Sequence, residues 1–203
     1  EPGYLTVAFD VHEPTFRHKM YAEYKGTRKM MAEELRQQVP FMKEMLAAMG
    51  IKTVEFPGYE ADDLLGTLAK RAEEAGFSVS VVSGDRDLLQ LATERVKIRI
   101  PKTKKTGTEI EDYYAKDVAD RYLVTPAQFV DVKALMGDAS DNIPGVPGIG
   151  EKTATSLIAA YGSIENAYAH ADEIKPKRAK ENLKAHYDLA ELSKSLAAIH
   201  TDV

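Results

Sequence analysis

The chain contains no cysteine, which excludes disulfides and any metal site built on thiolates. It has no apolar run long enough to cross a membrane, and no signal-like segment opens it. We therefore expect a soluble, cytoplasmic protein with no membrane partner. Its 203 residues, 44% of them hydrophobic, suffice to bury a core in one domain or in two small ones.

An excess of positive charge is also missing, since the formal net charge is −5, and this argues weakly against a polyanionic partner. The acids are clustered, however, and the remainder of the chain is positive once the eight carboxylates discussed below are set aside. Basic clusters then stand out over residues 95–105 and 175–184. A local basic patch, rather than net charge, is the electrostatic footprint of nucleic-acid binding. Either cluster could equally be an ordinary solvated surface.

The stretch over residues 59–87 carries the strongest chemical signal. A predicted amphipathic helix begins with three acids and ends at Gly76, and the apolar strand Val79–Val82 leads into two more acids. These five carboxylates are Glu60, Asp62, Asp63, Asp85 and Asp87. The helix dipole alone could account for acids at the helix start, but not for those beyond the strand. Because ligands bind at the carboxyl ends of strands and Mg²⁺ prefers carboxylate oxygens, we predict a metal site here.

The first strand and the segment after it extend this site. Residues 5–9 read as a buried strand that ends in Asp10, the same placement as Asp85. Residues 12–31 then interleave basic and aromatic side chains, a mixture that suits a phosphodiester and its bases. An exposed helix whose tyrosines pack on a neighbour is the alternative for this segment.

The rest of the first 122 residues alternates helices and strands. Residues 32–49 form a helical pattern that Pro40 kinks or splits, and its methionines are most simply core filler. Further strands are expected over residues 51–56, 96–100 and 109–113, with a short helix from residue 88 and a polar hairpin tip over residues 102–108. We predict an α/β domain over residues 1–122, with a largely parallel central sheet flanked by helices.

Residues 123–203 read as an all-helical subdomain. Thr125 and Pro126 are a sound start for a helix that runs to Met136. The turn that follows adds two carboxylates, Asp138 and Asp141. Helices are then expected to about residues 160 and 169, followed by a long one over about residues 179–199.

A loop rich in glycine and proline, Gly145–Lys152, is the second strong signal. Its three glycines allow close backbone approach, and the next helix points unpaired N–H groups outward. Together with Lys152 and Thr153, those groups could hold a DNA phosphate without reading sequence. A plain helix connector is the poorer explanation of this composition.

The ordered set of motifs resembles the 5′ nuclease domain of bacterial DNA polymerase I, of the flap endonuclease superfamily. The similarity rests on Phe9-Asp10, Thr15-Phe16-Arg17, Tyr24-Lys25 with Arg28, Glu60-Ala61-Asp62-Asp63, Gly84-Asp85-Arg86-Asp87, the run from Leu135 to Asn142, and Gly145–Lys152. It covers essentially the whole chain, and it implies that residues 123–203 are an all-helical helix-hairpin-helix (helix-three-turn-helix) DNA-binding subdomain. It implies a structure-specific 5′-3′ exonuclease or 5′-flap endonuclease that acts on DNA in primer removal and repair.

The resemblance also implies residue roles. Two or more Mg²⁺ or Mn²⁺ ions would be held by Asp10, Glu60, Asp62, Asp63, Asp85, Asp87, Asp138 and Asp141. A helical arch would match residues 16–31, with Lys25 and Arg28 on the scissile phosphate. DNA would be contacted by Arg17, Tyr24, Gly145, Val146, Gly148, Ile149, Gly150, Lys152 and Thr153, with K⁺ as a candidate ligand of the glycine loop.

The chain departs from the family pattern at its start, where relatives have a further strand and helix with an Asp-Gly-Asn motif. We therefore expect a fragment that lacks the N-terminal strand, binds flapped DNA and cleaves it poorly by itself. A polymerase domain is expected in the full-length protein. The alternatives are a free-standing exonuclease of the same superfamily, a non-catalytic DNA-binding module, and an RNA-cleaving nuclease, which would be expected to lack the Gly145–Lys152 loop.

Overall fold

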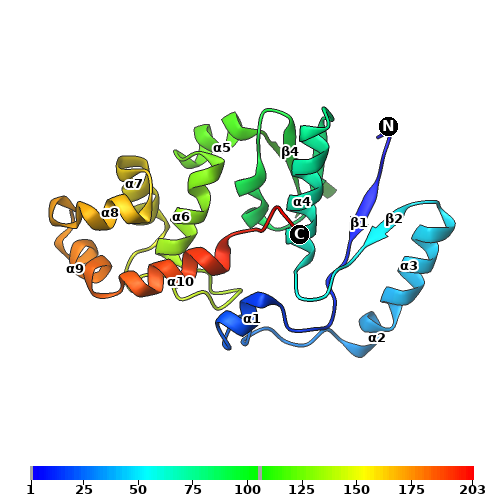
Figure 1. Cartoon of the computed structure of the whole chain (residues 1–203), viewed down its shortest axis with the longest axis horizontal. Helices are drawn as coiled ribbons and strands as arrows, with labels where there is room; N and C mark the ends of the chain where they lie inside the picture. The colour runs from blue at the N-terminus through cyan, green and yellow to red at the C-terminus, as the bar shows by residue number, and fades with distance from the viewer. Residues whose placement is uncertain (1, 105–106) are drawn as a thin grey trace.

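The computed structural model describes residues 2–104 and 107–203, with an α/β part followed by a helical part (Figure 1). Strand β1 (Thr6–Ala8) pairs in parallel with β2 (Lys52–Val54). In a second sheet, β3 (Val79–Val82) pairs in parallel with β4 (Val96–Lys104), and β4 pairs antiparallel with β5 (Gly107–Tyr113). The predicted α/β fold with parallel strands is confirmed, although the described strands form two small sheets rather than one.

The helices of the α/β part surround these sheets. They are α1 (Phe16–Met20), α2 (Glu33–Arg36), α3 (Gln38–Ala48), α4 (Ala61–Glu74), a 3₁₀ turn (Arg86–Leu91) and α5 (Ala115–Tyr122). The expected split of the helix over residues 32–49 occurs at Gln37. Pro40 lies in the first turn of α3, where its missing N–H would have had no partner within the helix. The sequence analysis did not anticipate α5.

The expected helical arch over residues 16–31 is wrong for most of that segment. Beyond α1, residues 22–27 form turns, and Lys25 has a left-handed backbone with φ of 54°. Lys25 N–H donates to the carbonyl of Asp141 at 2.8 Å, so the segment is held against the helical part by a contact that no local pattern specifies. The tip of the β4–β5 hairpin, residues 105–106, lies outside the described residues; both strands extend farther toward it than expected.

The helical part starts as predicted, with the Thr125 hydroxyl accepting from Gln128 N–H and Pro126 in the first turn. Its elements are α6 (Pro126–Met136), α7 (Glu151–Tyr161), α8 (Ile164–Ala169), a 3₁₀ turn (Ala171–Glu173), α9 (Lys177–Ala185) and α10 (Tyr187–Ala197). The single long helix expected over residues 179–199 is wrong, because the chain breaks at His186. The break redirects α10, which packs along α6.

One continuous core joins the two parts of the chain. It contains Leu89 and Ile98 from the α/β part together with Leu135, Ile158 and Leu183 from the helices, all fully buried. Helix α6 packs against both the 3₁₀ turn after β3 and helix α7, so it carries the core across the boundary at residues 122/123.

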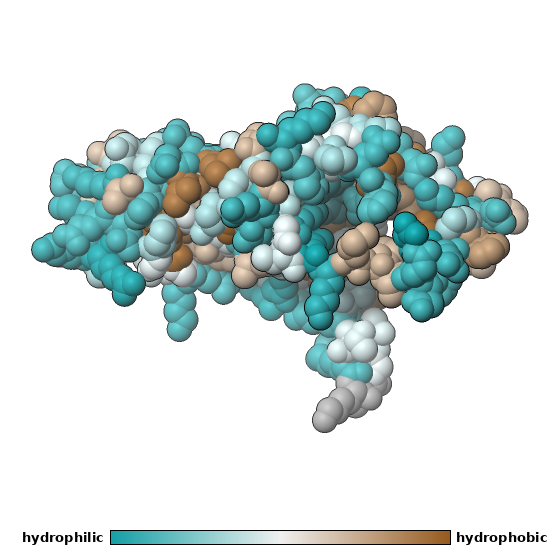
Figure 2. All heavy atoms as spheres, turned by 90° about the horizontal axis from the view of Figure 1, so that it is seen from below, coloured by the Kyte–Doolittle hydropathy of each residue, from teal (hydrophilic) through white to brown (hydrophobic). Residues whose placement is uncertain are grey.

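The methionines of α3 and of the residue that caps it are not core filler, contrary to expectation. Met42, Met45 and Met49 are 42–65% exposed, and α3 has no buried residue. Figure 1 places α3 at the right-hand end of the molecule, and Figure 2 shows apolar side chains at the surface of that end. None of the helices in the described part of the chain is both long and apolar enough to span a membrane.

Candidate metal centre and nucleic-acid interface

Helix α4 brings its acids to one end of the α/β part. Glu60 is the N-cap residue, and its own N–H donates to the Asp63 carboxylate at 3.0 Å, which forms a reciprocal capping box. The buried side of the helix, including Leu64 and Ala69, packs into the molecule and fixes the direction of this first turn.

Three carboxylates from three elements form the first acidic group: Asp10, Asp62 and Asp85. Asp10 follows β1 and accepts the Ala61 N–H at 2.8 Å, which places it at the start of α4. Burial raises the pKa of Asp62 to about 7, with further increases from Asp85, Asp10 and Glu60. None of the three carboxylates has a cationic partner within 4.0 Å among the described residues. Like charges that lack a cation fit a site for a divalent metal ion.

The second acidic group is organised by Lys133, a residue that the sequence analysis missed. The Lys133 ammonium lies 2.7 Å from Asp87 and also pairs with Asp138, and the residue is only 7% exposed. Burial raises the pKa of Asp87 to about 6 even though Lys133 opposes the increase. Burial would also raise the pKa of Asp138, but hydrogen bonds from Lys133 and Ser140 lower it to about 2. The available signal was a lysine inside the apolar run of α6, between Val132 and Ala134.

Glu60 and Asp141 hold the basic segment that follows α1. Lys25 donates to Glu60 at 2.7 Å, and Arg28 pairs with Asp141. The hydroxyl of Tyr24 lies between the two acids, 3.1 Å from Glu60 and 3.2 Å from Asp141. Lys25 and Arg28 therefore lie beside the acids, as predicted for groups that contact a phosphate there.

Asp63 is corrected from a metal ligand to a structural residue. It is fully buried, and its two oxygens accept from Arg17 at 2.7 and 2.8 Å. The same oxygens accept the N–H groups of Glu60 and His200 at 3.0 and 2.9 Å. Burial would raise the pKa of Asp63, but Arg17 outweighs it and lowers that pKa. An ion would have to break these bonds to bind.

Arg17 and Tyr24 are also corrected, because neither can contact DNA as it lies. Arg17 is 2% exposed and Tyr24 is 3% exposed. Besides Asp63, Arg17 donates to the carbonyls of Leu196 and Ala198. Both side chains join distant parts of the chain around the acids.

No group of three or more described aspartate, glutamate or histidine side chains is arranged to hold one ion as placed. The acids form two neighbouring groups instead, related through Asp85, whose charge raises the pKa of both Asp62 and Asp87. Their carboxylate oxygens are ligands that suit Mg²⁺ or Mn²⁺. The metal centre therefore stays a prediction, now with seven acids, because Asp63 is excluded.

The glycine loop is accessible at only some of its predicted positions. Val146 and Ile149 are 2% and 3% exposed, so their side chains belong to the core, and Gly145 is buried as well. Gly148, Gly150 and Lys152 are exposed, and Thr153 is half-buried. Contact with DNA is therefore open to the exposed glycine backbones and to the start of α7, but not to the side chains of Val146 and Ile149.

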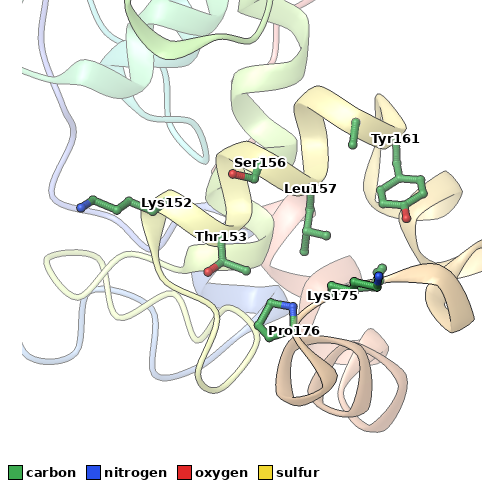
Figure 3. Close-up of a pocket in the computed structure, with 9 residues that line it drawn as sticks. Lys152, Thr153, Ser156, Leu157, Tyr161, Lys175 and Pro176 are labelled. Atoms are coloured by element: carbon green, nitrogen blue, oxygen red, sulfur yellow. The ribbon is translucent and has the colours of Figure 1, made fainter.

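A pocket of about 360 Å³ adjoins this loop. Figure 3 shows Thr153 and Ser156 along α7, Lys175 and Pro176 on the neighbouring segment, and the Lys152 side chain reaching outward. The pocket lies between α7 and the start of α9, and it is lined by apolar as well as polar side chains.

Comparison with known proteins identifies the family and the fold. The family model for the 5′-3′ exonuclease N-terminal resolvase-like domain matches residues 1–123, and that for the 5′-3′ exonuclease C-terminal SAM fold matches residues 124–203. The chain belongs to the 5′-3′ exonuclease family.

Close relatives of this exonuclease domain are much longer proteins. It is 53% identical to DNA polymerase I of Bacillus caldotenax over 202 residues, and 48% identical to that of Bacillus subtilis strain 168. In both comparisons the match covers 100% of this chain and 23% of the relative. The resemblance predicted from the motifs is confirmed: this is a nuclease domain like the 5′-3′ exonuclease domain of these polymerases.

Solved structures of nucleases have the same fold. A structure of T5 5′-exonuclease with bound zinc ions matches with a TM-score of 0.80 at 27% identity, covering 96% of this chain and 74% of that one. The catalytic core of Rad2 in complex with DNA matches with a TM-score of 0.58 at 18% identity, covering 92% of this chain and 59% of that one. At that identity the Rad2 match shows the fold alone.

Proposed function

We propose that this domain hydrolyses phosphodiester bonds of DNA at 5′ ends and 5′ flaps, using two or more Mg²⁺ or Mn²⁺ ions. The observation that carries the proposal is the group of Asp10, Asp62 and Asp85, brought together without a described cationic partner beside Lys25 and Arg28. Support also comes from T5 5′-exonuclease, solved with zinc ions, and from T5 D15 flap endonuclease, solved with DNA and metal ions.

In this proposal the two acidic groups hold separate ions. One ion would be held by the first acidic group, Asp10, Asp62 and Asp85, together with Glu60. The other would be held by Asp87 and Asp138 together with Asp141, and Asp85 would lie between the two ions. The ions would supply an activated water and stabilise the leaving oxygen. Lys25 and Arg28 would donate to the phosphoryl oxygens. Since these two side chains donate to Glu60 and Asp141, a short movement would bring them to a bound phosphate.

Duplex DNA would be held on the surface of the glycine loop. The two basic clusters of the sequence differ in their ion pairs. In the cluster over residues 95–105, Lys97, Arg99 and Lys102 pair with acids of β5. Lys175 and Arg178, by contrast, form no ion pair with any residue that the structure describes. Within the second cluster, free positive charge therefore adjoins the loop. K⁺ at the loop backbone is part of this proposal.

The duplex contact can be tested separately from cleavage. Lys152→Ala is expected to weaken binding of all duplex sequences alike and to reduce the salt slope by about one. Lys116→Ala, which removes an exposed lysine paired with Asp120 on α5, is the matched control. An unchanged salt slope in Lys152→Ala would contradict the placement of DNA on this loop.

The decisive experiment is cleavage of a labelled 5′-flap duplex by the full-length protein with Mg²⁺, with Mn²⁺ or with EDTA. Cleavage is expected with either metal ion and not with EDTA. Asp85→Asn should slow cleavage by about a hundredfold or more, because it removes a carboxylate that would hold a metal ion beside the reacting phosphate. Binding of the duplex should persist, since it is held elsewhere. The exposed Asp202→Asn is the control, and undiminished cleavage by Asp85→Asn would contradict the metal assignment.

We further propose that the domain is the nuclease part of a DNA polymerase I that acts in primer removal and repair. This proposal rests on the length of the relatives, of which the chain spans 23%. Nuclease and polymerase activities that copurify on one polypeptide would support it.

A further inference from the structure

Ser193 is a buried hydroxyl in an otherwise apolar face of α10. It is 0% exposed, and its neighbours on that face include Ala190, Leu196 and Ala197, all buried. A hydroxyl in such a place costs stability unless it is hydrogen-bonded. Its oxygen accepts the N–H of Gly145 at 2.9 Å, so Ser193 fixes the start of the glycine loop to α10.

Gly145 also packs against the turn that carries Asp138 of the second acidic group. A Cβ atom on Gly145 would lie 2.4 Å from the nitrogen of Gly137, so the two backbones pack in direct contact. Asp138, the next residue, exchanges two backbone hydrogen bonds with Ile143, at 2.9 and 2.8 Å. The glycine loop and the acidic turn therefore form one unit, anchored through Ser193.

Three residues beyond Ser193, the C-terminal end of α10 is anchored to the start of α4. The carbonyls of Leu196 and Ala198 accept from Arg17 at 2.9 and 2.6 Å, and Arg17 binds Asp63 in the first turn of α4. Figure 1 shows α10 running from the helical part to α1, after which the chain continues to α4. Helix α10 thus connects the loop proposed to hold the duplex with the helix that carries Asp62.

We propose that Ser193 is a positioning residue that determines where along the DNA strand the nuclease cuts. This inference rests on the proposed function. When the duplex is held at the glycine loop, the spacing between that loop and the acids selects which phosphate reaches the acids. Successive phosphates of a strand are about 3.4 Å apart along the helix axis, so a small shift of the loop relative to α10 brings neighbouring phosphates into competition.

The test is a map of product lengths from a labelled 5′-flap duplex, cut by the full-length protein with Mg²⁺ under single-turnover conditions. The wild-type protein should give one dominant product. In Ser193→Ala and Ser193→Cys, the rate of the dominant cut should fall about ten- to a hundredfold, because a misplacement of about 1 Å has that effect. Cuts at neighbouring phosphates should rise relative to it. The cysteine variant keeps nearly the same side-chain volume but accepts hydrogen bonds poorly.

Ser195→Ala is the matched control, since Ser195 is exposed on the same helix and donates to the carbonyl of Glu191. It should keep the wild-type product pattern. Hydrogen exchange provides a second readout, in which the Gly145 amide should lose protection in both Ser193 variants. A variant that is partly unfolded yields less of every product, so the ratio between products still reports the cut position.

Wild-type product ratios in both Ser193 variants would overturn the inference and reduce Ser193 to a stabilising role. If the wild-type protein itself fails to cut the flap with either metal ion, the proposed function fails, and the inference fails with it. The two failures are therefore distinguishable in the same experiment.

Discussion

Adjacent residues on α4 have opposite electrostatic surroundings. Asp63 accepts two hydrogen bonds from Arg17 and two from backbone N–H groups, and its pKa is lowered. Asp62 has no described ion-pair partner, and burial and other acids raise its pKa to about 7. Asp63 therefore stabilises the fold, whereas the charge of Asp62 opposes folding and is available to a metal ion.

Substitution of these two aspartates should separate the two roles. Asp63→Asn removes the two short bonds that pair the buried Arg17 with a carboxylate and leaves it only the contact with Glu60 at 3.5 Å. Breaking a buried pair typically costs about 3–5 kcal/mol of unfolding free energy. Asp62→Asn should leave stability unchanged or increased, because it removes a repelled charge. Urea unfolding with EDTA present measures both. An Asp63→Asn protein of wild-type stability that lost metal affinity would restore Asp63 as a metal ligand.

The raised pKa of Asp62 also predicts how stability depends on pH. Its pKa is about 7 in the folded protein and 3.8 without the fold, so the folded state binds the proton more tightly. The resulting stabilisation is fully present below pH 3.8 and is lost as the pH rises through about 7. Asp87, with a pKa of about 6, acts in the same direction.

In EDTA, the melting temperature should therefore decrease between about pH 5.5 and pH 8. Asp62→Asn should flatten this decrease, and Mg²⁺ should raise the melting temperature more at pH 8 than at pH 5.5. A wild-type profile retained by Asp62→Asn would show that other groups control this dependence.

At the scale of elements, the acidic turn and the glycine loop depend on close contact between two glycines. Gly137 and Gly145 both have left-handed backbones, with φ of 72° and 60°. A side chain at position 145 would overlap the backbone of residues 136–137, at distances of 2.4–2.7 Å. Gly150 differs, because its φ is −94° and a Cβ there would meet nothing within 4 Å.

Alanine substitutions should distinguish the two loop glycines. Gly145→Ala combines overlap with a strained backbone and should lower the free energy of unfolding by about 2 kcal/mol or more. Duplex binding should weaken with it, because the loop shifts. Gly150→Ala should change stability by less than about 0.5 kcal/mol, as most surface substitutions do. Urea unfolding and duplex binding check both, and equal effects would contradict the packing described here.

At the scale of the whole molecule, burial is unevenly distributed. The continuous core runs from Ala69 to Ala190, whereas α2 and α3 contain no buried residue. Helix α3 makes its main contact with the short strand β2. Local stability follows buried contacts, so α2 and α3 should open more readily than the rest of the 203-residue chain.

Hydrogen exchange on the 203-residue chain should show this difference directly. The backbone amides of α3 should exchange before those of α6 and α10, which pack against each other in the core. Equal protection of α3 and α6 would indicate that the exposed methionines are covered in solution.

The sequence by itself determined the order of the strands and the position of most acids. Apolar runs that end in Asp10 and Asp85 placed both residues at strand ends, and the capping pattern at Thr125 and Pro126 placed the start of α6. These signals are local, because they depend on neighbours within a few positions. The motifs also determined the family, since their order along the chain is itself a feature of the sequence.

Only the tertiary structure decided which charged residues are available. Arg17 and Asp63 are 46 positions apart and Lys133 is likewise distant from Asp87, and no spacing in the sequence announces either pair. The same holds for the break at His186, where no glycine or proline marks the boundary and after which α10 packs on α6. A carboxylate is free or paired according to what the fold places within about 4 Å of it, and the chain order does not contain that distance.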